Sequence, residues 1–407
     1  MINMRLLSLK KTFIFSLVLL TGLVINGVQV RAETDFESWL QALRKQAISQ
    51  GIRPETLDKA LQGVKPIPRV IELDQHQPEF TLTFWKYLNG AINDKRIKRG
   101  RALLKKHRKL LNKIEKKYGV PPRFLVSFWG LESNFGDYTG SFPTVGALAT
   151  LAYDKRRGAF FRAQLLALLS LIDAGDIPST IKSSWAGAMG NHQFIPTTYK
   201  SYAVDYDGDG KRDLWNSLPD IFASASNFLK ASGWQNNRNW GREVRLPKGF
   251  NLELSGLGAK RKLAEWNTLG LRRMDGRALP AVDINASVVL PAGYKGPAFL
   301  VYNNFRTTLK WNRSIFYAIA VGHLADRLAG AGPLKTPKPK QEIALSRKDI
   351  MDLQSLLNAK GFNAGGADGI LGSKTRNAVK AFQKSVRLPA DGFASFGLLE
   401  RLRGTDG

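Results

Sequence analysis

Helical periodicity over residues 33–241 constrains the fold of this chain more than any other feature. Amphipathic stretches follow one another there, and proline or glycine separates them. The separating residues are Pro54, Gly63, Pro66, Gly119 and Gly175. The pattern predicts a mainly α protein whose helices are joined by short turns.

The pattern changes twice after residue 241. Short apolar segments at 287–290 and 299–302 lie between Gly and Pro turns, which indicates a small β-rich insertion at about 242–310. A helix is expected again from Ser314 to Leu328. The mainly α region therefore spans 33–330 and contains the insertion.

A linker rich in Pro and Lys follows at 331–345 and precedes a compact tail at 346–403. Such a composition favours an extended, semi-rigid segment. The tail is long enough for one small module, so we expect a second domain there.

The N-terminus has the pattern of a signal peptide over residues 1–32. Arg5, Lys10 and Lys11 precede an unbroken apolar and small-residue stretch at 13–25, and Val30-Arg-Ala32 gives a small-x-small cleavage pattern. The alternative is a retained membrane anchor, for which the apolar stretch is short. The chain also has no cysteine, so disulfides and lipid attachment to an N-terminal cysteine are excluded. We expect a soluble, exported protein.

The charge balance indicates an anionic partner. Lys and Arg number 61 against 33 Asp and Glu, which leaves a net charge of +28. Nucleic acid, a membrane surface or an acidic polymer would fit, and export favours cell-wall or membrane anions. The stretch 95–117 holds 12 Lys or Arg with Glu115 as its one acid. It is interpreted as one long solvated helix face, and docking onto an anionic polymer is the less favoured alternative.

Glu132 is the candidate catalytic acid. The dipeptide Pro121-Pro122 is typical of a helix start. Seven residues make nearly two turns, so Glu132 should share the stripe of Leu125, beside Phe128 and Trp129. Partial desolvation there would raise the pKa of the carboxyl group, as a general acid near neutral pH requires. The alternative is an ordinary helical glutamate that faces solvent.

Two polar clusters could bind a sugar. Residues 183–199 combine small residues with the hydrogen-bonding side chains of Ser184, Gln193 and Tyr199, although a tight turn between helices would look similar. Residues 306–317 bring aromatic rings together with amide and hydroxyl groups. On their own, such residues are more often core and cap residues.

An acidic loop at 205–213 resembles the start of an EF-hand calcium loop. Carboxylates stand at loop positions one, three, five and nine, and Gly210 stands at position six. Position twelve is Asn216 where a bidentate Glu is expected, and Asp220 could close the shell instead. The alternative is an acidic turn without a metal. A bound Ca²⁺ would be structural.

Residues 33 to about 330 resemble the membrane-bound lytic murein transglycosylase B family, and the match is ordered and collinear. The matching runs are Tyr118–Pro122, Gly130–Gly136, Ala147–Leu151, Ala186–Gly190 with Gln193-Phe194, and Tyr202–Asp205 through Trp215. The resemblance implies a lysozyme-like helical catalytic domain in which Glu132 is the acid. The resemblance also implies that catalysis needs no cofactor.

The resemblance also implies a glycan-binding set and a calcium set. The glycan contacts would be Arg156, Arg157, Ser184, Gln193, Phe194, Trp311, Asn312 and Tyr317. The calcium ligands would be Asp205, Asp207, Asp209, the carbonyl of Lys211, and Asp220. Trp311 and Phe228 stand where tyrosines are expected, so a hydroxyl contact at each position is in doubt. Founding members carry a lipid on cysteine, whereas this chain resembles the soluble branch.

The tail resembles the common peptidoglycan-binding domain, a three-helix module. Its signature runs are Leu353–Leu357, Gly361-Phe362, Ala367–Thr375, Ala378–Gln383 and Leu388–Gly392. Together the two resemblances imply a periplasmic enzyme that cleaves the bond between N-acetylmuramic acid and N-acetylglucosamine without water, for cell-wall remodelling and turnover. The expected partners are peptidoglycan strands and, among proteins, those of wall synthesis. Nucleic acid and a stable membrane anchor are not expected, and the chain should be a monomer.

The implied mechanism needs one carboxylate, although ordinary glycosidases use two. Glu132 would protonate the bridging oxygen while the substrate acetamido group assists at the anomeric carbon. The carboxylate would then take the proton of the muramoyl C6 hydroxyl, which closes a 1,6-anhydro ring. The alternatives are a hydrolytic muramidase, a non-catalytic wall-binding protein and, resting on charge alone, an exported nucleic-acid-binding protein.

Overall fold

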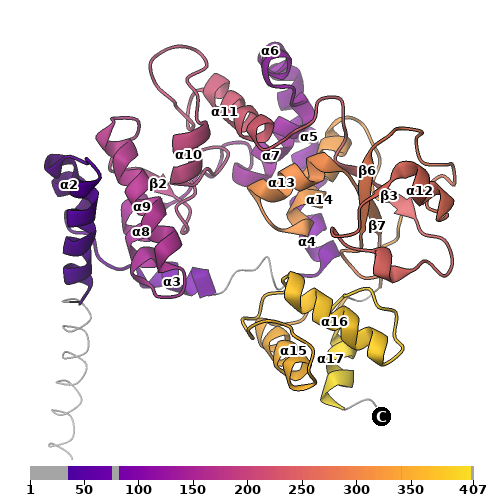
Figure 1. The fold of residues 1–407 in the computed structure, drawn as a ribbon. Helices are drawn as coiled ribbons and strands as arrows, with labels where there is room; N and C mark the ends of the chain where they lie inside the picture. The colour runs from indigo at the N-terminus through magenta and orange to yellow at the C-terminus, as the bar shows by residue number, and fades with distance from the viewer. Residues whose placement is uncertain (1–34, 76–81, 341, 405–407) are drawn as a thin grey trace, which may run out of the picture. The chain divides into compact units, whose positions relative to one another are not determined.

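The computed structural model describes residues 35–75, 82–340 and 342–404. The signal-peptide prediction for residues 1–32 lies outside this part. Two compact units make up the described chain, one with 35–72 and 141–187 and the other with 73–140 and 188–404. Most elements in both units are α-helices (Figure 1). The prediction of a mainly α fold is therefore confirmed.

The first unit is built around two helices that pack along each other. Its elements are a helix over 35–49, α2 (Pro54–Leu61), most of α3 (Pro68–Gln75), β1 (Phe142–Pro143), α8 (Thr144–Tyr153), α9 (Gly158–Asp173) and β2 (Lys182–Ser183). Nearly every residue of α8 is buried, and α8 packs mainly on α9. A Cβ atom on Gly187 would lie 2.4 Å from the Leu148 side chain, so this glycine serves helix packing.

The second unit contains a helical body. Its helices are α4 (Phe84–Ala91), α5 (Asp94–Lys106), α6 (Arg108–Tyr118), α7 (Pro122–Ser133), α10 (Pro196–Tyr202), α11 (Leu218–Ala231), α13 (Asn303–Trp311) and α14 (Ile315–Leu328). Helix α7 starts at Pro122 as predicted, and its backbone ends in the left-handed conformation at Asn134. Residues 124–130 of α7 are all buried, because α5, α6, α11 and α14 pack around this helix.

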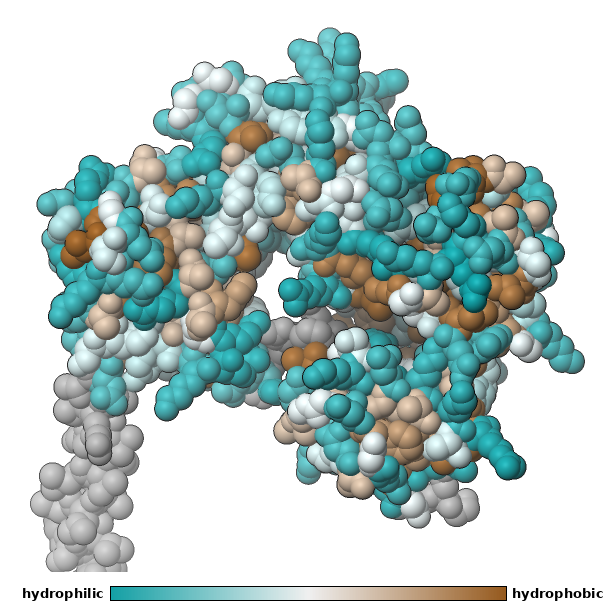
Figure 2. Space-filling model, in the orientation of Figure 1, coloured by the Kyte–Doolittle hydropathy of each residue, from teal (hydrophilic) through white to brown (hydrophobic). Residues whose placement is uncertain are grey.

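The basic stretch 95–117 forms two helices, so the prediction of one long helix is wrong. His107 leaves the helical conformation with φ −101° and ψ 16°, and it ends α5 and precedes α6. The break lets α5 pack on α7 and α14 while α6 packs on α11. Most of the Lys and Arg side chains are exposed, and hydrophilic side chains project where α6 lies (Figure 2). The interpretation as a solvated surface agrees with this exposure.

A five-stranded antiparallel sheet interrupts the helical body. Its strands, in spatial order, are β4 (Arg261–Lys262), β6 (Asn285–Val289), β7 (Ala298–Val301), β3 (Gly241–Arg245) and β5 (Arg272–Arg273). Val288 pairs with Leu300 and Val244 with Ala298, which sets the register. Helix α12 (Leu263–Thr268) contributes the buried Trp266 to the core of this insertion. The two strands predicted from apolar runs are β6 and β7.

The tail folds into three helices, as predicted. They are α15 (Arg347–Ala359), α16 (Ser373–Ser385) and α17 (Phe396–Arg403). Gln354 and Gln383 each use the side-chain amide to hold an Asp-Gly turn. Gln354 accepts the N–H of Gly369 at 2.9 Å, and Gln383 accepts that of Gly392 at 2.8 Å. These buried amides explain why Asp-Gly turns recur in the sequence of the module.

Candidate active site

The carboxylate of Glu132 receives two hydrogen bonds on one oxygen. It lies half-buried in the last turn of α7, and its Oε1 atom accepts the indole N–H of Trp311 at 2.8 Å. The Tyr317 hydroxyl donates to the same Oε1 atom. Charge-assisted hydrogen bonds of this kind fix the orientation of a carboxylate. Because Oε1 is held by two donors, the acidic proton belongs on Oε2.

The two donors reach Glu132 from opposite sides of a helix junction. Trp311 ends α13, and Tyr317 lies in the first turn of α14. Between them, the Asn312 side chain accepts the N–H of Ser314 at 2.9 Å, and the Ser314 side chain caps α14. Asn312 therefore shapes the junction that aims both donors.

Aromatic rings hold the Trp311 indole in place. Phe128, Phe194 and Phe228 surround it with ring centroids 4.6, 5.3 and 5.0 Å away. These contacts leave the indole little freedom to turn away from Glu132. Sequence reasoning expected a tyrosine hydroxyl at position 311, whereas the indole N–H of this chain supplies a donor there. Phe228, where another tyrosine was expected, packs on the indole.

His192 also packs on Trp311, with ring centroids 5.9 Å apart. Burial lowers the pKa of His192 to about 4, so the imidazole is neutral near pH 7. Its Nε2 atom lies 3.4 Å from the Leu125 carbonyl oxygen. His192 therefore supports the aromatic cluster as an uncharged ring.

Gln193 and Phe194 belong to a tight turn in the same unit as Glu132. Gln193 has a left-handed backbone with φ 51°, and its amide donates to the carbonyls of Thr139 (3.2 Å) and Gly190 (2.9 Å). Phe194 is buried and exchanges backbone hydrogen bonds with Met189. The structure thus brings Gln193, Phe194, Trp311, Asn312 and Tyr317 into the unit of Glu132.

The other three predicted glycan contacts belong to the first unit, and the structure does not place them against Glu132. The backbone N–H of Arg156 donates to Asp154, and the Arg157 guanidinium lies 4.8 Å from the Phe161 ring centre. The Ser184 hydroxyl accepts the N–H of Ala186 at 3.3 Å. Their glycan-binding roles stay predictions.

Asp137, the acid that follows Glu132 in the sequence, is held in an ion pair. Arg99 donates to both carboxylate oxygens of Asp137, one of them at 2.7 Å, and Asn134 donates at 2.9 Å. The hydrogen bond from Arg99 is the main reason why the pKa of Asp137 is lowered. A carboxylate bound in this way is a poor candidate for a second catalytic group.

Asn191 connects the catalytic helix to the acidic loop, a role that sequence reasoning missed. Its Oδ1 atom accepts the indole N–H of Trp129 at 2.7 Å. Its Nδ2 atom donates to the carbonyls of Leu214 (3.2 Å) and Trp215 (2.8 Å). One buried amide thus links α7 to the residues that follow the acidic loop. In the sequence, Asn191 is marked only by its position inside the glycine-rich run 183–199, and this position does not indicate its hydrogen-bond partners.

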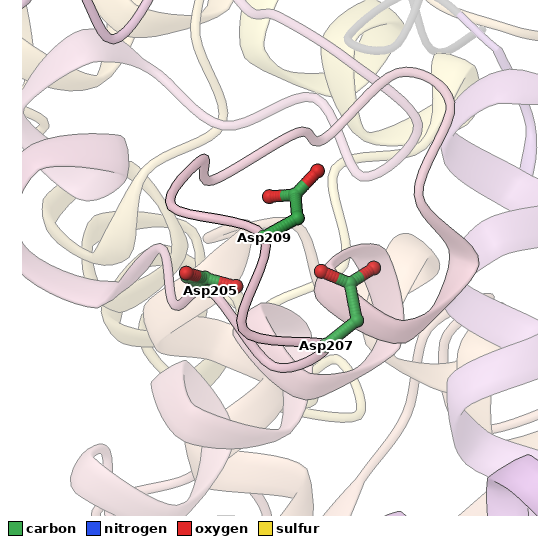
Figure 3. A group of neighbouring side chains, drawn as sticks. All are labelled: Asp205, Asp207 and Asp209. Atoms are coloured by element: carbon green, nitrogen blue, oxygen red, sulfur yellow. The ribbon is translucent and has the colours of Figure 1, made fainter.

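Three carboxylates of the acidic loop lie close together. Ligand oxygens of Asp205, Asp207 and Asp209 lie within 4.8 Å of one another, and Figure 3 shows the side chains on one loop. An all-oxygen set of carboxylates has the chemistry that Ca²⁺ prefers. The loop residues therefore fit a calcium ion.

Asp220 fastens the loop to α11 through the backbone. Its carboxylate is buried and accepts the N–H groups of Tyr206 (2.7 Å) and Asp213 (2.9 Å). Burial raises the pKa of Asp220. The backbone N–H of Lys211 donates to Asp209 at 2.9 Å. The assignments of Asp220 and of the Lys211 carbonyl as metal ligands stay predictions.

Comparisons with known proteins agree with this site. The family of the Transglycosylase SLT domain matches residues 35–326. The chain belongs to this family. A peptidoglycan binding domain family matches residues 346–402.

Relatives of known structure extend this result. SltB3 of Pseudomonas aeruginosa, solved in complex with NAG-anhNAM-pentapeptide, is 47% identical with a TM-score of 0.86, over 90% of this chain and 99% of that one. Lytic transglycosylase Slt35 of Escherichia coli, solved in complex with calcium, is 29% identical with a TM-score of 0.62, over 71% of this chain and 92% of that one. Membrane-bound lytic murein transglycosylase B of Escherichia coli (strain K12) is 29% identical over 71% of this chain and 82% of its own length.

The chain is a peptidoglycan lytic transglycosylase with a lysozyme-like helical domain, as the resemblance implied. Its C-terminal module is a peptidoglycan-binding domain. Within residues 35–75, 82–340 and 342–404, no helix is long and apolar enough to span a membrane.

Proposed function

We propose that Glu132 acts alone as acid and then as base in the cleavage of the bond between N-acetylmuramic acid and N-acetylglucosamine. The observation that carries this proposal is the pair of donors on Oε1 of Glu132. They orient the carboxyl group so that the proton on Oε2 can be delivered to the bridging oxygen. A positioned side chain of this kind contributes about 10²–10⁴-fold to the rate of proton transfer.

In the first step, Oε2 of Glu132 gives its proton to the glycosidic oxygen. The bond from that oxygen to the anomeric carbon breaks, and the acetamido oxygen of the substrate bonds to the anomeric carbon. The leaving sugar departs with a neutral hydroxyl group. Trp311 and Tyr317 stabilise the carboxylate that forms on Glu132.

In the second step, the carboxylate takes the proton of the muramoyl C6 hydroxyl. The C6 oxygen bonds to the anomeric carbon, and the acetamido oxygen leaves and is restored as the amide. The product is a 1,6-anhydro ring, and Glu132 is protonated again. Because nucleophile and electrophile belong to one sugar, the closure is intramolecular and needs no water.

The substitution Glu132→Gln tests this proposal. Glutamine keeps the size of the side chain but cannot donate the acidic proton, so turnover should fall by orders of magnitude while the fold is kept. Mass spectrometry of the released muropeptides should give anhydro products from the unmodified enzyme. Products heavier by one water would identify a hydrolytic muramidase, and normal cleavage by the glutamine variant would refute the role of Glu132.

A structural Ca²⁺ in the acidic loop is part of the proposal. Asp205, Asp207 and Asp209 would hold the ion, with the Lys211 carbonyl and Asp220 completing its shell. The complex of the related Slt35 with calcium supports this assignment. The ion would neutralise the three carboxylates and stiffen the loop.

We also propose that the enzyme is exported to the periplasm after removal of residues 1–32 and acts there as a monomer. The basic n-region, the apolar stretch and the absence of cysteine support export without a lipid anchor. Domain limits of 33–330, 331–345 and 346–403 follow from the sequence pattern. Arg156, Arg157 and Ser184 would add glycan contacts from the first unit.

A further inference from the structure

A cavity of about 590 Å³ lies beside the C-terminal module. Glu132 and its two donors are not among the residues that line it. The lining comes from α4, α14, α15, α16 and the start of α17, from loops near residues 291–296 and 392–395, and from the linker. Small-molecule sites typically measure about 300–1,000 Å³. The cavity is therefore large enough for a short peptide segment.

The walls of the cavity are mainly apolar. Trp85 and Phe316 line it from the helical body, and Val379, Phe393 and Phe396 line it from the module. Phe396 is 37% exposed, although it is a large apolar side chain of the module. Such a surface suits a ligand that carries short aliphatic groups.

The hydrogen-bonding groups in these walls are mostly donors. The Arg376 guanidinium lines the cavity, and its Nε–H donates to the Leu371 carbonyl at 3.2 Å. Arg376 is in none of the ion pairs found among the described residues, and burial lowers the pKa of the guanidinium. Trp85 is 7% exposed, and none of the described residues accepts its buried indole N–H. Lys295 and Lys338 add positive charge to the lining.

Among the described residues, the lining contains one acid, Glu342, against the three cations Arg376, Lys295 and Lys338, so it keeps a net positive charge. Glu342 accepts a hydrogen bond from the Thr83 hydroxyl, on the linker side of the cavity. A ligand that supplies an anionic acceptor would pair with Arg376, since a guanidinium binds a carboxylate with two parallel hydrogen bonds. One guanidinium in a lining with mainly apolar walls suits a carboxylate with aliphatic neighbours.

Polar contacts join the module to the sheet insertion. Lys384 forms an ion pair with Glu253 at 2.6 Å, and Lys380 donates to the carbonyls of Glu253 and Ser255 at 3.2 and 3.1 Å. Asp391 accepts the N–H of Tyr294 at 2.9 Å. The module is thus fixed to the insertion before a ligand binds, which lowers the entropic cost of binding.

We propose that this cavity binds the C-terminal carboxylate of a peptidoglycan stem peptide, with Arg376 as its anion partner. The inference rests on the proposed function, because peptide stems accompany the glycan that the enzyme cleaves. A stem peptide ending in D-Ala–D-Ala offers one carboxylate next to two methyl side chains, which matches one guanidinium between apolar walls. The module would thereby retain strands that carry peptides.

Isothermal titration calorimetry on the intact protein tests this site. The probes are a free stem pentapeptide that ends in D-Ala–D-Ala and the same peptide with a C-terminal amide. We expect the acid to bind at least about tenfold more tightly than the amide, because a hydrogen-bonded charge pair is lost in the amide. Arg376→Gln should weaken binding of the acid by about 10- to 100-fold. Arg387→Gln, a change at an exposed arginine outside the cavity lining, should leave the affinity unchanged.

Phe396→Ala provides a second variant that does not depend on Arg376. Its side chain is partly exposed, so the module should stay folded, as circular dichroism would verify, while affinity for the acid falls. Equal binding of acid and amide, or unchanged affinity in Arg376→Gln, would overturn the proposal. Cleavage of peptide-free glycan distinguishes failure of this binding site from failure of the proposed function. If the enzyme forms anhydro products but does not bind the peptide, this site alone is refuted. If no anhydro products form, the proposed function is refuted.

Discussion

Replacing Trp311 with phenylalanine removes one donor from Glu132 and leaves most of the ring packing in place. The lost hydrogen bond spans 2.8 Å and ends on a carboxylate oxygen. Hydrogen bonds to charged groups contribute about 1.5–3 kcal/mol, which corresponds to about 10- to 150-fold in rate. Tyr317 still donates to the same oxygen, so we expect the lower end, about a tenfold loss of kcat.

The rings around position 311 predict that substrate binding suffers less than turnover. Phe128, Phe194 and Phe228 would still contact a phenylalanine, so the aromatic cluster keeps its packing. Steady-state kinetics on purified glycan strands should therefore show a lower kcat with a KM close to that of the unmodified enzyme.

A double-mutant cycle with Tyr317→Phe sharpens this prediction. Both donors act on one oxygen, so their losses should be non-additive by about 0.5 kcal/mol or more. Unchanged kcat in Trp311→Phe, or full additivity in the double variant, would refute the reasoning that the two donors jointly position Glu132.

Three further predictions concern stability and the metal. Burial lowers the pKa of His192 to about 4, whereas an unfolded histidine has a pKa of about 6.5. Between pH 6.5 and 4 the unfolded state therefore binds a proton that the folded state does not bind. The free energy of unfolding should fall by about 3 kcal/mol as the pH drops through this range. Urea unfolding across this range checks the slope, which His192→Gln should flatten; an equal slope in both proteins would contradict the burial argument. Calcium should raise the Tm of the unmodified protein more than that of Asp207→Asn, and an equal rise would exclude the acidic loop as the site. Gly322→Ala places a Cβ atom 2.1 Å from the Trp240 ring and should lower the free energy of unfolding by about 1–3 kcal/mol. The control Gly332→Ala has no atom within 4 Å of the new Cβ and should not lower the Tm. Equal Tm values in the two variants would argue against close packing at Gly322.

Local signals in the sequence predicted many of the elements. Pro122 starts α7, Ser314 caps α14, and two apolar runs form the adjacent strands β6 and β7. Each of these signals acts within a few residues, through a fixed φ angle, a capping hydroxyl or an alternating apolar pattern. A single sequence is therefore sufficient to predict features that depend on residues close together in the chain.

Features that depend on distant partners were not predictable in the same way. His107 divides the basic stretch into α5 and α6, which share α7 as a partner but otherwise pack on different helices, α14 for α5 and α11 for α6. Periodicity does not report the partner of a helix. Trp311 was predicted as a glycan contact, but its hydrogen bond to Glu132 joins residues 179 positions apart. Asn191 was overlooked because its value lies in joining Trp129 to Leu214 and Trp215.

The separation of Glu132 from its donors has a consequence for shortened forms of this chain. A chain that ends after α11 contains the acid but neither donor. Glu132 and Tyr317 lie 185 positions apart, and the sheet insertion lies between them. Closing so long a loop is slow and late in folding. Wall-cleaving activity thus depends on completion of nearly the whole domain, and truncated chains ending before α13 should be harmless to peptidoglycan.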